Sequence, residues 1–221
     1  DLTRYTNILS TRITFSTAKS LGIDRFIFSS SCSVYGMSNK KRSENSKLNP
    51  ISFYAQSKVD SEKELISLAA RNPNISLTIL RFATVYGHSF RPRFDLVANI
   101  FSANAARKKD LNVYGPQQWR PFVHVFDVAN AINTVLDSNI SIVKNEIFNV
   151  GHDTGNITLG DLAMRIKNVA NKNGIPKNSF KVNLIKGKPS DLRNYIVSFD
   201  KIHRRLNYNI KFTLEYGIEE I

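Results

Sequence analysis

Two short segments carry residue types that can move a proton and a hydride at an alcohol carbon. Residues 28–36 read FSSSCSVYG, which places a serine cluster at the end of an apolar run, and Tyr54 stands four positions before Lys58. Residues four apart on a helix share one face, so this lysine would lie beside the tyrosine. Its ammonium would favour the phenolate and lower the tyrosine pKa from about 10, which makes Tyr54 a candidate general base.

The surrounding pattern predicts how these residues are positioned. Residues 25–30 are typical of a buried strand, and its carboxyl end would present the serines where open parallel sheets bind ligands. A helix is predicted over 53–71, with Tyr54 at its start, and a strand over 75–82. Strand, helix and strand of this length form a βαβ unit. The Tyr-x-x-x-Lys spacing is a weak signal alone, and this context is what favours a catalytic interpretation.

The rest of the chain continues the alternation of helices and strands. Residues 3–20 have apolar positions at helical spacing and stop near Gly22. Thr158 is expected to cap a helix that runs to 170. Further strands are predicted over 111–114, 121–125, 147–150 and 180–185, and further helices over 94–107, 127–136, 199–206 and 213–221.

Composition narrows the class of protein. With 221 residues, of which 42% are hydrophobic, the chain can bury one sizeable core or two modest ones. No apolar run approaches the ~18 residues of a membrane span, so we expect no membrane partner. The single cysteine, Cys32, excludes an internal disulfide and fits a cytoplasmic location. The net charge of +13 raises a nucleic-acid hypothesis, but the basic residues are scattered and no recognition motif accompanies them.

Redox chemistry of this type needs a dinucleotide site, normally a glycine-rich turn that meets the pyrophosphate. None of the ten glycines falls in a G-x-G-x-x-G spacing, and the sequence begins inside a helical pattern. We therefore expect this sequence to be the C-terminal part of a longer protein.

Five blocks in order resemble the extended short-chain dehydrogenase/reductase superfamily, and within it the NAD-dependent nucleotide-sugar epimerases and dehydratases. The blocks are 28–36, 54–58, 80–87, 113–115 with 119–128, and 191–193 with 199–202. The resemblance implies an α/β fold, the C-terminal part of a doubly wound Rossmann-type parallel sheet plus a smaller mixed α/β lobe. It assigns 1–85 and 118–150 to the NAD-binding domain, and 86–117 and 151–221 to the nucleotide-sugar-binding lobe.

The resemblance also implies roles for individual residues. Tyr54 would be the acid/base, Lys58 would hold the nicotinamide ribose, and Ser31 would hydrogen-bond the sugar hydroxyl. Asp191 would accept hydrogen bonds from the nucleotide ribose. The implied cofactor contacts are Ser29, Tyr54, Lys58, Phe82 and Val85, and the implied substrate contacts are Ser31, Ser33, Thr84, Asn99, Tyr114, Arg120, Lys188 and Asp191.

The sequence departs from the family pattern at informative positions. Thr84 stands where many members have an asparagine, and Lys188 where an arginine is common. Sugar 4,6-dehydratases carry Asp-Glu after the catalytic threonine, whereas this chain has Cys32 and Ser33, which argues against a dehydratase. The resemblance favours epimerisation at C4 of a nucleoside-diphosphate sugar, with NAD as cofactor and NADP as the alternative. A 4-keto-sugar reductase and a non-catalytic nucleotide-binding relative are the alternatives.

Several residues also have purely structural interpretations. His124 lies in an apolar run and is expected to be a core histidine, and Asp127 is expected to cap the following helix. Cys32 is expected to be a buried thiol rather than a nucleophile, and Arg120 could be a surface cation. The helices over 3–20 and 53–71 resemble the pair that joins subunits in this family, which implies a homodimer.

Overall fold

A central parallel sheet positions the serine segment. The computed structural model describes residues 2–185 and 193–221, and its sheet has the order β1 (Arg25–Ser31), β2 (Ser76–Phe82) and β6 (Glu146–Val150). The register pairs Ser31 with Phe82, and Phe82 with Val150, so the three carboxyl ends form one edge. Every residue of β2 before Phe82 is buried, as expected for a parallel strand covered on both faces.

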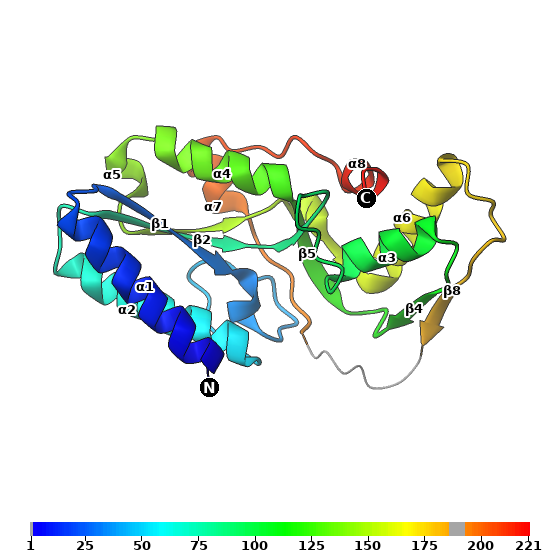
Figure 1. Ribbon diagram of the computed structural model, residues 1–221, viewed down its shortest axis with the longest axis horizontal. Coiled ribbons are helices and arrows are strands. Elements are labelled where there is room, and N and C mark those ends of the chain that lie inside the picture. Colours follow the sequence, from blue (N-terminus) through cyan, green and yellow to red (C-terminus); the bar gives the residue numbers. More distant parts are fainter. Residues whose placement is uncertain (1, 186–192) are drawn as a thin grey trace.

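Helices cover both faces of this sheet (Figure 1). α1 (Leu2–Ser20) and α2 (Phe53–Ala70) pack on one face, where Phe15, Leu65 and Ile79 form a core. α4 (Val125–Asp137), α5 (Ile140–Val143) and α7 (Asp200–Leu206) lie on the other face, over a larger core. This three-layer arrangement is the Rossmann-type α/β fold that the resemblance implied.

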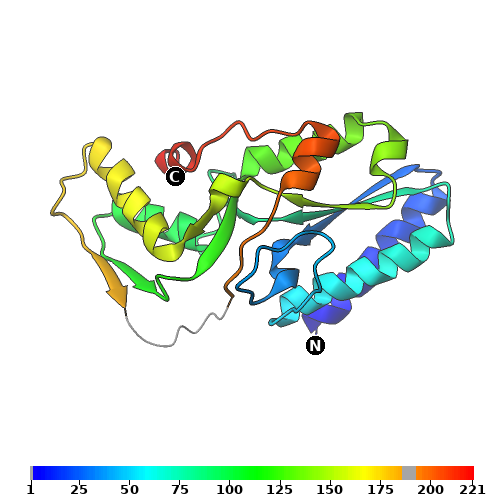
Figure 2. The ribbon, with the colours of Figure 1, turned by 180° about the vertical axis from the view of Figure 1, so that it is seen from behind.

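A smaller lobe of helices and strands lies beside the central sheet (Figure 2). β5 (Trp119–His124) pairs in parallel with β3 (Thr84–Tyr86) and antiparallel with β7 (Asn156–Thr158). β4 (Leu111–Tyr114) pairs in parallel with β8 (Val182–Ile185). α3 (Val97–Ala106), α6 (Leu159–Lys172) and α8 (Leu214–Glu219) share a separate core with these strands.

The N-terminal ends of two helices differ from the sequence-based predictions. Asp127 does not cap α4, because it lies inside the first turn of that helix. Its carboxylate accepts hydrogen bonds from the backbone N–H groups of Lys211 (2.7 Å) and Phe212 (3.3 Å). His124 is the N-cap, and its ring nitrogen accepts from Phe126 N–H. α3 begins at Val97 rather than at 94. Thr158 caps α6 as predicted.

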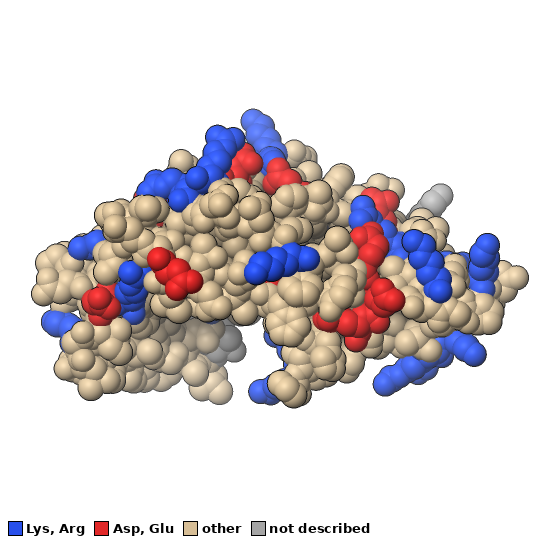
Figure 3. Space-filling model, turned by 90° about the horizontal axis from the view of Figure 1, so that it is seen from above, with Lys and Arg blue, Asp and Glu red and all other residues tan. Residues whose placement is uncertain are grey.

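The three-residue strands β3 and β7 were not predicted, and neither were the short 3-10 helices η1 (Cys32–Tyr35) and η2 (Asp153–Gly155). Elements this short carry too few residues for a period to be recognised. Within the described residues, no helix combines the length and the apolar character that crossing a bilayer requires. Lys and Arg are interspersed with Asp and Glu over the face in Figure 3.

Candidate active site

Ser31, Tyr54 and Lys58 meet at the carboxyl end of β1. The Lys58 ammonium donates a 2.8 Å hydrogen bond to the carbonyl oxygen of Ser29, and lies 5.8 Å from the centre of the Tyr54 ring. The Ser31 hydroxyl lies close enough to the Tyr54 phenol to lower its pKa. The structure therefore brings together the serine, tyrosine and lysine that the sequence singled out, on β1 and the first turns of α2.

Local capping explains this placement. Ser31 is the N-cap of η1, and its hydroxyl accepts from Ser33 N–H at 3.2 Å, which turns the chain sharply at the end of the strand. Ser52 is the N-cap of α2, and its hydroxyl accepts from Ala55 N–H at 3.1 Å. Tyr54 consequently lies in the first turn, where the positive end of the helix dipole favours a phenolate.

The pKa of Tyr54 corrects one expectation. Burial raises this pKa above its usual value, against the opposing effects of the Ser31 hydrogen bond and the charges of Arg93 and Arg193. The predicted lowering by Lys58 is wrong for this structure, because the lysine ammonium is directed to a backbone carbonyl and desolvation of the phenol dominates. Burial also lowers the pKa of Lys58, and the charge of Glu62 opposes that shift.

A cavity of about 420 Å³ contains three of the predicted substrate residues. Thr84 contributes from β3, Tyr114 from the end of β4, and Arg120 from β5. Arg120 is 4% exposed and donates a 3.0 Å hydrogen bond to the carbonyl of Trp119. Arg193 and Asn112 also line this space. The described lining thus combines hydrogen-bond donors with two guanidinium groups against one carboxylate, that of Asp95, and the excess positive charge suits an anionic ligand.

Other predicted site residues lie elsewhere. Asn99 is 3% exposed and is not among the residues that line the cavity; its side chain bridges the N–H of Gly87 (3.3 Å) and the carbonyl of Arg93 (3.2 Å). Ser33 is buried, and its hydroxyl has no hydrogen-bond partner among the described residues.

The remaining predicted cofactor contacts are at strand ends, and two substrate contacts cannot be placed. Ser29 and Phe82 lie at the carboxyl ends of β1 and β2, and Val85 pairs with Val123 between β3 and β5. Lys188 and Asp191 are outside the described residues.

Two charged residues near Tyr54 were missed by the sequence analysis. Arg93 forms hydrogen bonds of 2.7 and 2.5 Å to Asp95, and Asp95 also lines the cavity. Arg193 belongs to the Asp-Leu-Arg block of the family resemblance, in which only the aspartate has an implied role. The signal for Arg93 was an Arg-Pro-Arg run between a strand and a helix, a loop position of the kind that often carries function.

The structural interpretations of two other residues are confirmed. His124 is 1% exposed, and its Nε2 is 2.7 Å from Glu220 Oε1, as in a satisfied core histidine. Cys32 is fully buried, its thiol donates to the carbonyl of Arg81 at 3.2 Å, and burial raises its pKa, so it is not a reactive thiolate. No cluster of potential metal ligands occurs in the part of the chain that the structure describes.

Comparisons with known proteins place this geometry in context. Residues 1–151 match the profile of the NAD dependent epimerase/dehydratase family. An uncharacterised UDP-glucose epimerase of Bacillus subtilis (strain 168) is 37% identical over 115 residues, which are 52% of this chain and 35% of that protein.

Two solved structures share the fold. UDP-glucuronic acid 4-epimerase from Bacillus cereus, in complex with UDP-glucuronic acid and NAD, superimposes with a TM-score of 0.82 at 25% identity, over 98% of this chain and 66% of that one. UDP-glucose 4-epimerase from Thermotoga maritima, with UDP-glucose, gives 0.81 at 28% identity, over 98% and 68%. The chain thus spans about two thirds of these epimerases and about a third of the Bacillus subtilis relative.

Proposed function

The chain belongs to the NAD dependent epimerase/dehydratase family. From that premise we propose that it is part of an enzyme that epimerises nucleoside-diphosphate sugars at C4. The observation that carries the proposal is the meeting of Ser31, Tyr54 and Lys58 beside a cavity lined by arginines. These groups can exchange a proton with a secondary alcohol, and the cavity can hold the attached diphosphate.

The residues of this chain fit part of an NAD site. Tyr54 and Lys58 offer a phenol and an ammonium at the carboxyl edge of a parallel sheet, where ribose hydroxyls could accept and donate hydrogen bonds. Together with Ser29, Phe82 and Val85 they would hold the nicotinamide end. When bound, NAD supplies the acceptor and donor of hydride. NADP fits the same described residues.

Tyr54 is the acid and base of the proposed reaction. Its phenolate would take the proton from the sugar 4-hydroxyl as hydride leaves C4, and its phenol would return a proton to the same oxygen when hydride comes back to the other face of C4. The Ser31 hydroxyl would orient the sugar oxygen next to Tyr54, since it lies close enough to the phenol to lower its pKa. The Lys58 ammonium, which is directed to the Ser29 carbonyl, would hold the nicotinamide ribose. A positioned acid/base of this kind increases the reaction rate by about 10²- to 10⁴-fold.

The cavity would bind the nucleoside diphosphate. The guanidinium groups of Arg120 and Arg193 provide paired N–H donors for phosphate oxygens, and Thr84 and Tyr114 provide hydroxyls. Lys188 and Asp191 remain predicted contacts. Asn99 would act indirectly, by holding the loop of Arg93 against α3.

Arg120→Ala is expected to raise KM for the nucleotide sugar by about 10- to 100-fold, because a hydrogen bond to a charged group contributes about 1.5–3 kcal/mol. Arg120→Lys keeps the charge but loses the paired donors, so its KM is expected to lie between those of the wild type and Arg120→Ala. Arg165→Ala is the matched control: it removes an arginine that pairs with Glu215 outside this cavity. Steady-state kinetics of the full-length protein check this, and an unchanged KM for both Arg120 variants would contradict the diphosphate role.

The residues after Ser31 distinguish an epimerase from a dehydratase. Cys32 is a buried thiol and Ser33 a buried hydroxyl, so neither can act as the carboxylic acid or carboxylate that elimination of water requires. A 4-keto-sugar reductase would use the same serine, tyrosine and lysine. A reductase exchanges its cofactor at every turnover, whereas an epimerase can retain it, so cofactor that stays bound through gel filtration would favour the epimerase.

The direct experiment is to incubate the full-length protein with NAD and either UDP-glucose or UDP-glucuronic acid, the ligands of the two crystallised relatives. NMR spectra are expected to show the C4 epimer accumulating to equilibrium without net cofactor consumption. Consumption of NAD(P)H with a keto sugar would instead indicate a reductase. Binding without turnover of any nucleotide sugar would indicate a non-catalytic relative.

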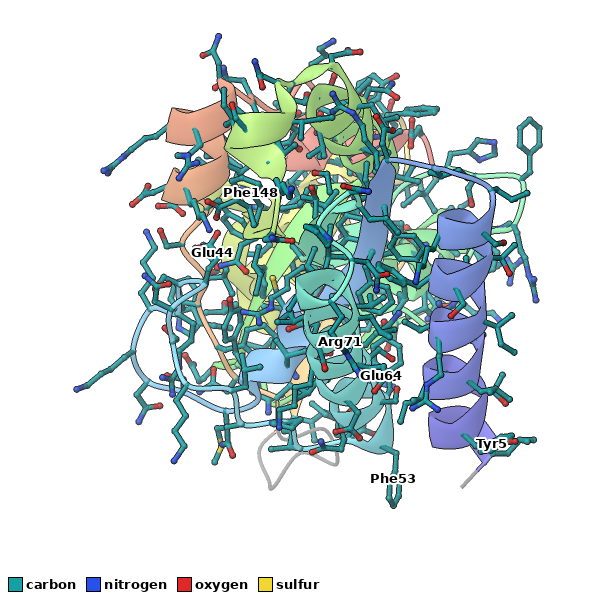
Figure 4. All side chains as sticks on the ribbon, turned by 90° about the vertical axis from the view of Figure 1, so that its left-hand side faces the viewer. Tyr5, Glu44, Phe53, Glu64, Arg71 and Phe148 are labelled. Carbon is teal, nitrogen blue, oxygen red and sulfur yellow. The ribbon has the colours of Figure 1, made fainter. Side chains whose placement is uncertain are left out.

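We also propose a cytoplasmic homodimer formed through α1 and α2. Apolar side chains are exposed on these helices, and Figure 4 shows Tyr5 and Phe53 projecting from the same end of the pair. Light scattering of the full-length protein is expected to give twice the mass of one chain, and Tyr5→Glu to shift it toward monomer. Met164→Glu, at an exposed apolar residue of α6, is expected to stay dimeric. A monomeric wild type would contradict this proposal.

The proposed division of labour follows the two lobes. Residues 1–85 and 118–150 would contribute to the NAD domain, and residues 86–117 and 151–221 would bind the nucleotide sugar. The central sheet and the smaller lobe have separate hydrophobic cores, but the ranges cross between them: Val197 and Phe199 pack in the core of the central sheet, and Phe122 packs in that of the smaller lobe.

A further inference from the structure

A buried ion pair lies directly behind the candidate active site. Glu62 of α2 is 2% exposed and Arg81 of β2 is 3% exposed. The guanidinium donates from Nε to Glu62 Oε1 at 3.0 Å and from Nη2 to Oε2 at 2.6 Å, which is a two-pronged arrangement. Apolar side chains of similar volume often stabilise a core as much as a buried ion pair does, because both charges of the pair lose their hydration. Its presence therefore suggests a role beyond stability.

The carboxylate also reaches the catalytic strand. The hydroxyl of Ser30 donates to Glu62 Oε1 at 2.5 Å, and Ser30 precedes the candidate catalytic Ser31. Tyr54, Lys58 and Glu62 are spaced four residues apart and share one face of α2. Lys58 donates to the Ser29 carbonyl, Glu62 accepts from the Ser30 hydroxyl, and the Ser31 hydroxyl lowers the pKa of Tyr54. Two turns of the helix thus hold two neighbouring residues of the strand, next to Ser31.

Arg81 extends this hold to the neighbouring elements. Its Nη1 donates to the hydroxyl of Tyr35 at 3.0 Å, and that hydroxyl donates to Asn149 Oδ1 at 2.8 Å. Asn149 is on β6, and Tyr35 is in η1, immediately after the serine segment. The network therefore links α2 to all three strands of the parallel sheet and to the turn that carries Ser31 (Figure 1).

We propose that Glu62, held by Arg81, is a positioning residue that sets Lys58 and Tyr54 against Ser31. Glu62 is buried and does not line the cavity; it would act through its hydrogen bond with Ser30 and through its charge at Lys58, four residues earlier. This proposal deepens the proposed function and depends on it. The structure gives Glu62 a second effect of the same kind, since its negative charge opposes the lowering of the Lys58 pKa by burial.

Glu62→Gln is the sharpest test, because the amide keeps the shape and can still accept from Ser30 but lacks the charge. In the full-length protein with NAD and UDP-glucose, we expect kcat to fall by about 10- to 100-fold with KM nearly unchanged, the size of effect that a small misplacement produces. Lysine NMR, with the Lys58 signal assigned by Lys58→Arg, is expected to show a lower Lys58 pKa in the variant. Ser61→Ala is the matched control: Ser61 is also buried on α2, and its hydroxyl has no hydrogen-bond partner in the part of the chain that the structure describes.

The controls separate positioning from folding and from the proposed function. If Glu62→Gln does not fold, the double variant Glu62→Gln/Arg81→Met removes both charges and is expected to fold with the same kinetic and Lys58 effects. If the wild type turns over no sugar, the proposed function fails, and the Lys58 titration alone decides the positioning role. A Lys58 pKa that is unmoved in the folded variant, or a kcat within twofold of wild type, would overturn the proposal.

Discussion

Tyr54→Phe is expected to reduce kcat of the full-length protein by at least about 10³-fold while nucleotide-sugar binding is retained. The substitution removes one oxygen, which is the atom that accepts and returns the proton, and leaves the ring in place. Loss of a positioned acid/base removes about 10²–10⁴ of rate, and Tyr54 serves in both directions of the cycle. Steady-state kinetics, with titration of the nucleotide sugar into the variant, measure the two quantities separately.

Tyr216→Phe is a matched control, since Tyr216 is 48% exposed against 47% for Tyr54 and lies on α8, away from the serine segment. Burial raises the Tyr54 pKa, so the phenolate fraction, and with it turnover of the wild type, should increase as pH rises. Turnover by Tyr54→Phe at more than a tenth of the wild-type rate would contradict the assignment.

Arg81→Met is expected to lower the free energy of unfolding by about 3–5 kcal/mol, the largest stability effect among the substitutions considered. It leaves the Glu62 carboxylate buried without its counter-ion, and an unpaired buried charge is costly. For a chain of this size, each kcal/mol corresponds to about 2–4 °C in Tm. Thermal and urea unfolding of the full-length protein measure the change.

The control is Arg165→Met, which breaks an ion pair whose two side chains are about half exposed. Such surface pairs contribute about 0–1 kcal/mol. Adding Glu62→Gln to Arg81→Met is expected to recover part of the loss, because no buried charge then remains. If Arg81→Met costs no more than Arg165→Met, the buried pair is not an energetically coupled unit.

The sequence allowed the candidate catalytic segment and its supporting elements to be located because their signals are local. The strand over 25–30 is apolar up to its serines, and the helix over 53–71 starts at a Ser52 cap with a helical period. The comparisons and the sheet confirm the family and the α/β fold.

The predictions that were wrong concern residues whose surroundings depend on contacts with distant parts of the sequence. Asp127 has the residue type of a cap, but the backbone of 211–212, more than eighty positions later, takes up its carboxylate. The Tyr54 pKa was inferred from the lysine alone, whereas burial by surrounding elements dominates it.

The buried ion pair was also missed, for a related reason. Glu62 falls within an ordinary helical pattern and Arg81 within an otherwise apolar strand, SLTILRF. Each alone is typical of a solvent-exposed charge. The available signal was the arginine itself, because a charge inside a strand that is buried on both faces requires a partner. The spacing of Glu62 four residues after Lys58 then indicates the helix face that provides it.

The most direct test of the account follows the hydrogen on C4 of the sugar. The full-length protein, loaded with NAD, is given UDP-glucose that carries deuterium at C4, and the product is analysed by NMR and mass spectrometry. If the hydride is removed and returned within one active site, the C4 epimer retains its deuterium and none appears in free cofactor or solvent. Loss of the deuterium from the epimer, or its accumulation in released cofactor, would contradict epimerisation by transient hydride transfer.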